Sequence, residues 1–276
     1  MLSLTITCRS LSRFLRCALL LSHLLSVSVF LGAEHSADQQ LLAAIHAADP
    51  VGVQTAITAG AKVDGDLLGV AAWDYQVWQR EQRNLTASDL KARAEAIMQL
   101  LLTAGAQRQI DAADNYEADT AAMLAVRAGN LVVLPILQAG GANLNQQNND
   151  GDTALSLACA LFDQQKGRVG LEQVVAINRF LIDAGTDVNL ADSVGATPLM
   201  RLAEAYARNY DYYSNNDQFA QDRKFDLLAT AHSLFTHGAR LTAEDFAGRT
   251  AYDYAQAKGQ DADELNEFQI WLMNNA

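Results

Sequence analysis

The side chains that could do acid–base or metal chemistry in this chain are few and widely spaced. After residue 33 the histidines are His35, His46, His232 and His237. Only the last two are close in sequence, and five residues around the end of a helix is a poor spacing for sharing one metal ion. The motifs H-E-x-x-H, G-x-S-x-G, G-x-x-x-x-G-K-[ST] and C-x-x-C do not occur. The sequence therefore predicts no metal site, no cofactor and no catalytic residue.

One acidic segment, Asn148-Asn-Asp-Gly-Asp152, has the residue types of a calcium loop. An EF-hand loop would also need an acidic side chain at its twelfth position, and counting from Gln146 that position is Leu157. A tight turn accounts for the same residues, because Asn, Asp and Gly favour turns. We therefore expect a turn between helices here.

After residue 33 the chain has a single cysteine, Cys159, in the small-residue run Ser156-Leu-Ala-Cys-Ala160. One cysteine cannot form a disulfide within the chain, even in an oxidising compartment. Its place among small residues of a helix predicts a buried structural thiol.

The first 33 residues have the layout of a secretory signal peptide. Three arginines precede an apolar run at residues 17–31, and no acidic residue occurs before Glu34. A basic start followed by about 15 apolar residues is typical of such signals, whereas a membrane-spanning helix needs roughly 20. We expect cleavage after Ala33 and export of residues 34–276 to the periplasm. The alternative is an uncleaved membrane anchor.

The chain is acidic, with a formal net charge of −12. Loss of the three N-terminal arginines leaves 17 Lys and Arg against 32 Asp and Glu, a net charge of −15. Such a charge repels nucleic-acid phosphates and anionic membranes, and it favours a partner with a basic surface. The alternative is that the acidity only keeps an exported protein soluble.

The elements that position these side chains are predicted by a short phrase that occurs four times. Each copy ends in Thr and leads into a small-residue helical run, and Gly-Ala or a close variant follows downstream. A fixed period of 33 residues, the distance from Thr120 to Thr153, indicates a solenoid whose units cannot bury their apolar faces alone. The four copies are residues 115–120, 148–153, 192–197 and 245–250.

This pattern resembles the ankyrin repeat, whose consensus runs D-x-x-G-x-T-P-L-H-x-A-A and then V-x-x-L-L-x-x-G-A. The resemblance implies an all-α solenoid of about six helix pairs with short hairpin loops and long helix–helix insertions. It divides residues 34–276, a single domain, into an N-terminal cap at 38–64, repeats at about 65–110, 115–145, 148–189 and 192–242, and a C-terminal cap repeat at 245–276.

Three kinds of position have specific expected roles. We call the first helix of each pair the inner helix and the second the outer helix. The Thr residues should cap the inner helices, and a glycine in the left-handed region should end each outer helix. The family's His after T-P-L is absent, which puts any hydrogen-bond ladder through it in doubt. Its positions hold Met123, Ser156, Met200 and Asp253, and the helix-ending glycines are Gly60, Gly105, Gly141, Gly185 and Gly238.

The glycines are 45, 36, 44 and 53 residues apart, so all four intervals exceed the period of 33, one of them by only three residues. The three larger excesses fall at roughly 73–90, 163–171 and 207–224. Insertions at one point of several repeats emerge on one face, often the binding face, and aromatic residues are common interface anchors. The alternative is that lengthened helices pack these rings on each other, as we expect for Trp73 and Tyr206. The residues predicted to contact a partner are Tyr75, Trp78, Tyr210, Asp211, Tyr212, Tyr213, Asp217 and Phe219.

Together these features predict a periplasmic protein-binding scaffold, with a bacterial source inferred from an exported ankyrin array without disulfides. Its most specific form is an immunity-type inhibitor that neutralises a periplasm-acting toxin, such as a cell-wall amidase or lipase, by stoichiometric binding. The alternatives are an accessory factor supporting an oxidative-stress enzyme such as catalase, a hydrolase with a site in the insertions, and a module that tethers envelope complexes. The expected partner is another protein with a basic surface, with no nucleic acid and no membrane insertion after signal cleavage.

Overall fold

The computed structural model describes residues 37–276 apart from 83, 114–116, 164–169, 210–217 and 257–265, and without the side chains of 163, 218–221 and 223. The chain separates into two units, residues 1–36 and 37–276, and only the second is described. The predicted signal peptide, residues 1–33, therefore lies outside the described residues. Within the described part, none of the helices has the length and apolar character needed to cross a bilayer.

The prediction of an all-α protein is confirmed for the described residues, which form twelve α-helices, two short 3-10 helices and no strand. The helices are α2 (Ala37–His46), α3 (Pro50–Thr58), α4 (Asp66–Glu81), α5 (Ala87–Ala104), α6 (Ala121–Ala128), α7 (Leu134–Ala139), α8 (Ala154–Ala160), α9 (Leu171–Asp183), α10 (Pro198–Arg208), α12 (Gln218–Thr236), α13 (Ala251–Tyr254) and α14 (Glu267–Asn275). The 3-10 helices are η1 (Ala106–Gln109) and η2 (Leu161–Asp163).

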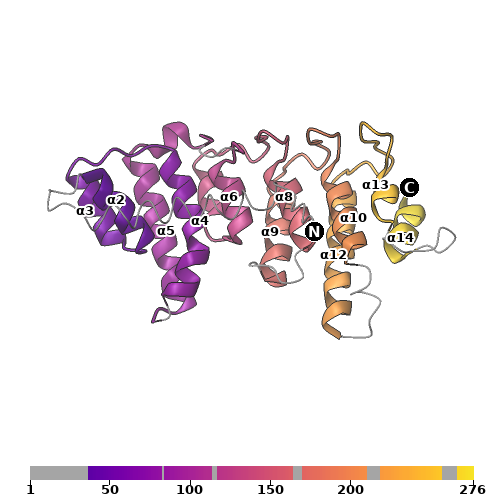
Figure 1. Cartoon of the computed structure of the whole chain (residues 1–276), viewed down its shortest axis with the longest axis horizontal. Helices are drawn as coiled ribbons and strands as arrows, with labels where there is room; N and C mark the ends of the chain where they lie inside the picture. The colour runs from indigo at the N-terminus through magenta and orange to yellow at the C-terminus, as the bar shows by residue number, and fades with distance from the viewer. Residues whose placement is uncertain (1–36, 83, 114–116, 164–169, 210–217, 257–265) are drawn as a thin grey trace, which may run out of the picture. The chain divides into compact units, whose positions relative to one another are not determined.

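The helices pack in consecutive pairs, and the pairs lie side by side (Figure 1). The pairs are α2 with α3, α4 with α5, α6 with α7, α8 with α9, α10 with α12, and α13 with α14. One row of contacts runs from α2 to α4, α6, α8, α10 and α13. On the other side, α3 contacts α5, α5 contacts α7, and α9 contacts α12. In the part of the chain that the structure describes, the helices therefore form two layers, and the main contacts of each pair are with the pairs next to it in sequence.

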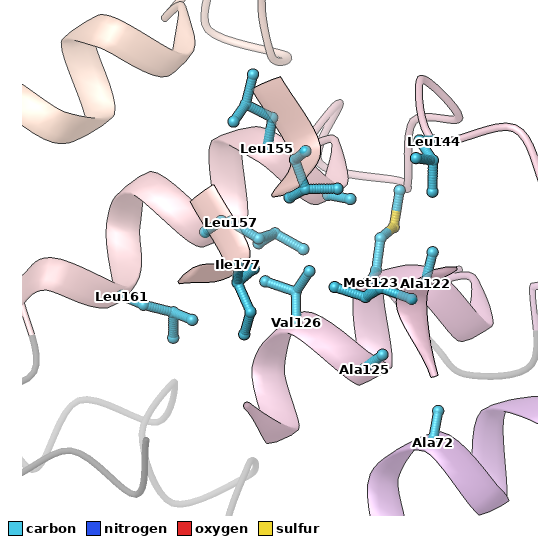
Figure 2. Packing of buried hydrophobic residues seen from close by; sticks show 14 of the residues in the cluster. Ala72, Ala122, Met123, Ala125, Val126, Leu144, Leu155, Leu157, Leu161 and Ile177 are labelled. Carbon is cyan, nitrogen blue, oxygen red and sulfur yellow. The ribbon is translucent and has the colours of Figure 1, made fainter. Parts of the chain in front are cut away.

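A single apolar cluster lies between these layers and extends from Leu41 in α2 to Leu272 in α14. Val126 of α6, Leu157 of α8 and Ile177 of α9 gather in its middle (Figure 2). Fully burying one such side chain stabilises the fold by about 1.5–3 kcal/mol relative to leaving it exposed. Because each pair contributes only one slice of this cluster, each pair depends on its neighbours for burial.

The inner helices begin where the Thr residues were expected to cap them. The hydroxyls of Thr120, Thr153 and Thr197 each accept the backbone N–H three residues on, at 3.4, 3.1 and 3.4 Å. A cap of this kind stabilises a helix by about 1 kcal/mol. At α13 the Thr250 N–H donates to the Asp253 carboxylate at 2.7 Å.

Two residues at positions where the ankyrin consensus has His, Ser156 and Asp253, form hydrogen bonds at the start of their own helices. Ser156 Oγ accepts the N–H of Thr153 at 2.9 Å, as Asp253 does for Thr250. Each closes a capping box, in which the first and fourth residues satisfy each other's free donors. These side chains therefore stabilise their own helix.

Glycines end the outer helices as predicted. All five have positive φ, from 79° at Gly185 to 129° at Gly105, a region that costs little only for a residue without Cβ. The N–H of Ala142, just after Gly141, returns to the Leu137 carbonyl at 3.0 Å and satisfies the end of α7. The same closing bond follows Gly60, Gly185 and Gly238.

Two of the three predicted insertions appear as longer helices. α4 continues to Glu81 and α5 begins at Ala87, so most of 73–90 is helical. α4, α5 and α12 extend beyond the shorter helices on the side away from the turns that join the pairs (Figure 1). Much of 163–171 and of 207–224 lies outside the described residues.

Candidate functional site

Three of the turns that join one helix pair to the next, at residues 148–153, 192–197 and 245–250, are built around an Asn or Asp five residues before the capping Thr. In each turn one side-chain oxygen accepts the backbone N–H groups of the residues two and four positions on. This closes the loop from inside, as Asx turns do. The donor–acceptor distances are 3.0 and 2.9 Å at Asn148, 3.0 and 2.9 Å at Asp192, and 2.9 and 2.8 Å at Asp245.

Successive turns are joined to each other through the backbone. The N–H of Ser193 donates to the Asp150 carbonyl at 2.9 Å, and the N–H of Phe246 donates to the Val194 carbonyl at 3.1 Å. The first of these contacts depends on Gly151, whose φ is +76° and where an added Cβ would lie 2.4 Å from the Ser193 nitrogen. The turns therefore stack closely enough to form one continuous ledge.

Arginines of the inner helices are tied to carboxylates at the base of the turns. Arg127 of α6 pairs with Asp119 at 2.8 Å and with Glu117 at 3.1 Å. On α10, Arg201 pairs with Asp192 and, at 3.1 Å, with Glu204. Partly buried, multiply paired arginines are better ordered than isolated surface ion pairs, which contribute little.

The last turn has the most developed network. Asp245 Oδ2 lies 2.7 Å from an Arg249 guanidinium nitrogen and accepts the Tyr254 hydroxyl at 2.9 Å, while the guanidinium stacks 4.5 Å from the Tyr254 ring centre. Burial opposes ionisation of Asp245, but hydrogen bonds from the backbone and side chain of Arg249, from Tyr254 and from the Ala247 N–H outweigh it and lower its pKa to about 2.

The pKa of Asp152 is affected by burial and by residues of both the Arg127 and the Arg201 clusters. Burial raises the pKa of its carboxyl, and the nearby Asp192 carboxylate adds to the rise, while Ser156, Arg201 and Arg127 oppose it. Both arginines are thus within electrostatic reach of Asp152.

We call the ledge formed by these stacked turns the turn surface. Its exposed or half-buried residues are Glu117, Arg127, Asp150, Asp152, Val194, Arg201, Glu204, Phe246, Arg249 and Tyr254, and its buried residues are Asp119, Asp192 and Asp245.

Two of the residues predicted to contact a partner do not belong to any exposed surface. Trp78 is 1% exposed and Tyr75 is 7% exposed. The Trp78 indole N–H donates to the His46 carbonyl at 3.1 Å, and the two rings meet edge to face at 6.4 Å. That part of the prediction is wrong, because α4 turns both rings towards neighbouring helices, and the packing alternative describes them.

The other predicted contacts are not tested. Tyr210, Asp211, Tyr212, Tyr213 and Asp217 lie outside the described residues, and Phe219 lies in α12 with its side chain outside them. All six stay predictions.

The ring expected to pack, Tyr206, is 2% exposed and lies 5.4 Å from the Phe268 ring centre. Trp73, the other ring expected to pack, is half-buried.

Two side chains that could take part in reactive or metal-binding chemistry, Cys159 and Asn148, make hydrogen bonds within the fold. Among the described residues no group of three or more His, Cys, Asp and Glu is placed to hold a metal ion. Burial raises the pKa of the Cys159 thiol well above its usual value, and its Sγ donates to Asn178 Oδ1 at 3.3 Å. Asn148 Oδ1 is used within its own turn, as expected for a turn residue, and the Asn148 amide donates to Asp119 Oδ1 at 2.7 Å.

His46 forms a pair that the sequence did not predict. Its Nδ1 lies 2.5 Å from Oδ2 of Asp74, a buried residue of α4 that is 28 positions away. The hydrogen bond to Asp74 raises the His46 pKa, partial burial lowers it, and the charge of Asp74 adds to the rise. His46 therefore joins α2 to α4.

Comparison with known proteins found no family model that matches the chain and no matching curated protein.

Proposed function

We propose that residues 37–276 form an ankyrin-type solenoid that binds another protein through the turn surface. Three features support the solenoid. Among the described residues the main contacts of each helix pair are with its neighbours, Thr caps recur at the inner helices, and positive-φ glycines recur at the ends of the outer ones. Each is a property of stacked units with one shared core.

The observation that carries the binding role is the internal bonding that holds the turn surface in place. Asx side chains close the turns from inside, backbone bonds join one turn to the next, and arginines lock the turns to the inner helices. A surface that is already ordered loses little conformational entropy on binding, so more of its contact energy appears as affinity.

In its most specific form, the protein is an exported immunity-type inhibitor of a periplasm-acting toxin enzyme such as a cell-wall amidase or lipase. The signal-like residues 1–33 support export, and the net charge of −15 for residues 34–276 suits an enzyme with a basic surface. Stoichiometric binding over the enzyme's cleft would neutralise it without any chemistry by this chain.

The test is affinity capture with residues 34–276 from extract of the cells that make the protein. One bait carries Asp150→Arg, Ser193→Arg and Ala247→Arg at exposed turn positions. The control bait carries the same number of arginines at Gln54→Arg, Gln99→Arg and Gln138→Arg, exposed positions of α3, α5 and α7. Both should melt like the wild type, because exposed substitutions change stability by only about 0.5 kcal/mol.

A partner retained by the control and lost with the turn variant is expected. Equal retention by both baits would contradict binding through the turn surface, and a wild-type bait that captures nothing would contradict a protein-binding role in these cells. The captured protein is then assayed with equimolar wild type. Loss of its activity identifies an inhibitor, and undiminished activity identifies an accessory factor.

A further inference from the structure

Two apolar side chains stand out on the turn surface. Phe246 is 83% exposed and Val194 is 46% exposed, and they belong to consecutive turns joined by the Phe246 N–H to Val194 carbonyl bond. We call them the apolar pair. An aromatic side chain this exposed on a polar ledge gains nothing from the core, and aromatic residues are enriched at the centres of protein interfaces.

The backbone beneath Phe246 is held firmly. Asp245, its neighbour in sequence, accepts backbone bonds from Ala247 and Arg249 and side-chain bonds from Arg249 and Tyr254. On the other side, Gly195 leaves so little room that an added Cβ would lie 2.8 Å from the Phe246 nitrogen. The Phe246 ring is therefore presented from a rigid base, which is the condition for an energetically strong contact.

The charge around the apolar pair is negative. Arg249 is engaged by Asp245, and Arg201 is engaged by Asp192 and Glu204, so these cations are largely neutralised. In contrast, Asp150 and Glu244 are exposed and form no ion pair among the described residues. Asp150 belongs to the turn joined to that of Val194, and Glu244 lies two residues before Phe246.

We propose that the apolar pair is the anchor for a basic protein surface, which packs an aliphatic or aromatic side chain against Phe246 and Val194 and places Lys or Arg beside Asp150 and Glu244. The inference rests on the proposed function and names the chemistry of its partner. It places the main partner contact in the last two turns, at 192–197 and 245–250, and not in the aromatic insertions.

The test places a photo-cross-linking phenylalanine analogue, p-benzoylphenylalanine, in the full chain at one of three positions. These are 246, 150 on another exposed turn, and 225 on α12, where Phe225 is 71% exposed and serves as the matched control. The chains are irradiated in extract of the producing cells, and the cross-linked protein is identified by mass spectrometry, purified and titrated against Phe246→Ala and Phe225→Ala.

We expect cross-links from 246 and none from 225, to a protein whose cross-linked region is rich in Lys and Arg. Its dissociation constant should rise roughly tenfold or more with Phe246→Ala and stay unchanged with Phe225→Ala. Asp150→Asn with Glu244→Gln should slow association and reduce its dependence on salt.

Each other outcome overturns something definite. Cross-links from 150 without any from 246, an acidic contact region, or equal affinity of Phe246→Ala and wild type would overturn the anchor while leaving the proposed function standing. Cross-links from 225 alone would overturn the turn surface as well. Absence of cross-links from all three positions would overturn the proposed function itself.

Discussion

At the residue scale, the pair of His46 and Asp74 is the contact most sensitive to conditions. This pair and the bond from the Trp78 indole to the His46 carbonyl tie the first helix pair to α4, and the bond from Arg93 to the Ala48 carbonyl at 2.8 Å ties it to α5. Histidine is the side chain whose charge changes nearest neutral pH. The attachment of the first pair should therefore depend on pH.

The sign of this dependence follows from the raised pKa of His46. A group whose pKa is higher in the folded state stabilises the fold fully below its unfolded value, 6.5, and loses that contribution as pH rises through the folded value. We expect wild type to exceed His46→Gln in melting temperature by more at about pH 5.5 than at about pH 8.5. Arg93 is the nearby cation on α5, so Arg93→Gln serves as a control. A constant difference across this range would contradict the role of the pair.

At the element scale, the glycines divide into two groups with the same backbone conformation and different surroundings. Gly141 ends α7 with φ of +96° and has open space where a Cβ would lie. Gly151 in the stacked turn has φ of +76° and faces the Ser193 backbone. At Gly141 glycine is needed only for the positive φ. At Gly151 it is needed also because the Ser193 backbone lies too close for a Cβ.

This difference can be measured with alanine at both positions. Gly141→Ala should cost about 1–2 kcal/mol of unfolding free energy, the strain of a left-handed residue with Cβ. Gly151→Ala should cost clearly more and should weaken partner binding, because the Ser193 turn must move. Urea denaturation of both variants tests this, and equal losses would show that the turns are not packed as closely as described.

At the scale of the whole molecule, the shared core makes stability collective along residues 37–276. Leu155 is 0% exposed in α8 and belongs to the apolar cluster that links the first and last helices. In a stack where each pair is buried by its neighbours, loss of packing in the middle weakens the units on both sides.

We therefore expect Leu155→Ala to lower the free energy of unfolding by about 2–5 kcal/mol. Val51→Ala is the control, since Val51 is 74% exposed on α3 and should change stability by less than about 0.5 kcal/mol. Circular dichroism during urea denaturation gives both values. A loss at Leu155 no larger than at Val51 would contradict a continuous core.

The sequence alone determined where several of the inner helices begin and where the outer helices end. Thr120, Thr153 and Thr197 cap helices and Gly141 and its counterparts end them, because a cap or a left-handed residue acts within a few positions of itself. The turn at Asn148 was predictable for the same reason, since its side chain bonds to its own loop.

Only the tertiary structure decided which side chains are available to a partner. Trp78 looked like an exposed anchor and is buried, His46 meets Asp74 across 28 residues, and Val194 and Phe246 come together from turns 52 residues apart. Burial and pairing of this kind depend on which helix or turn lies alongside. That is set by how the pairs pack against each other, which no short stretch of sequence contains.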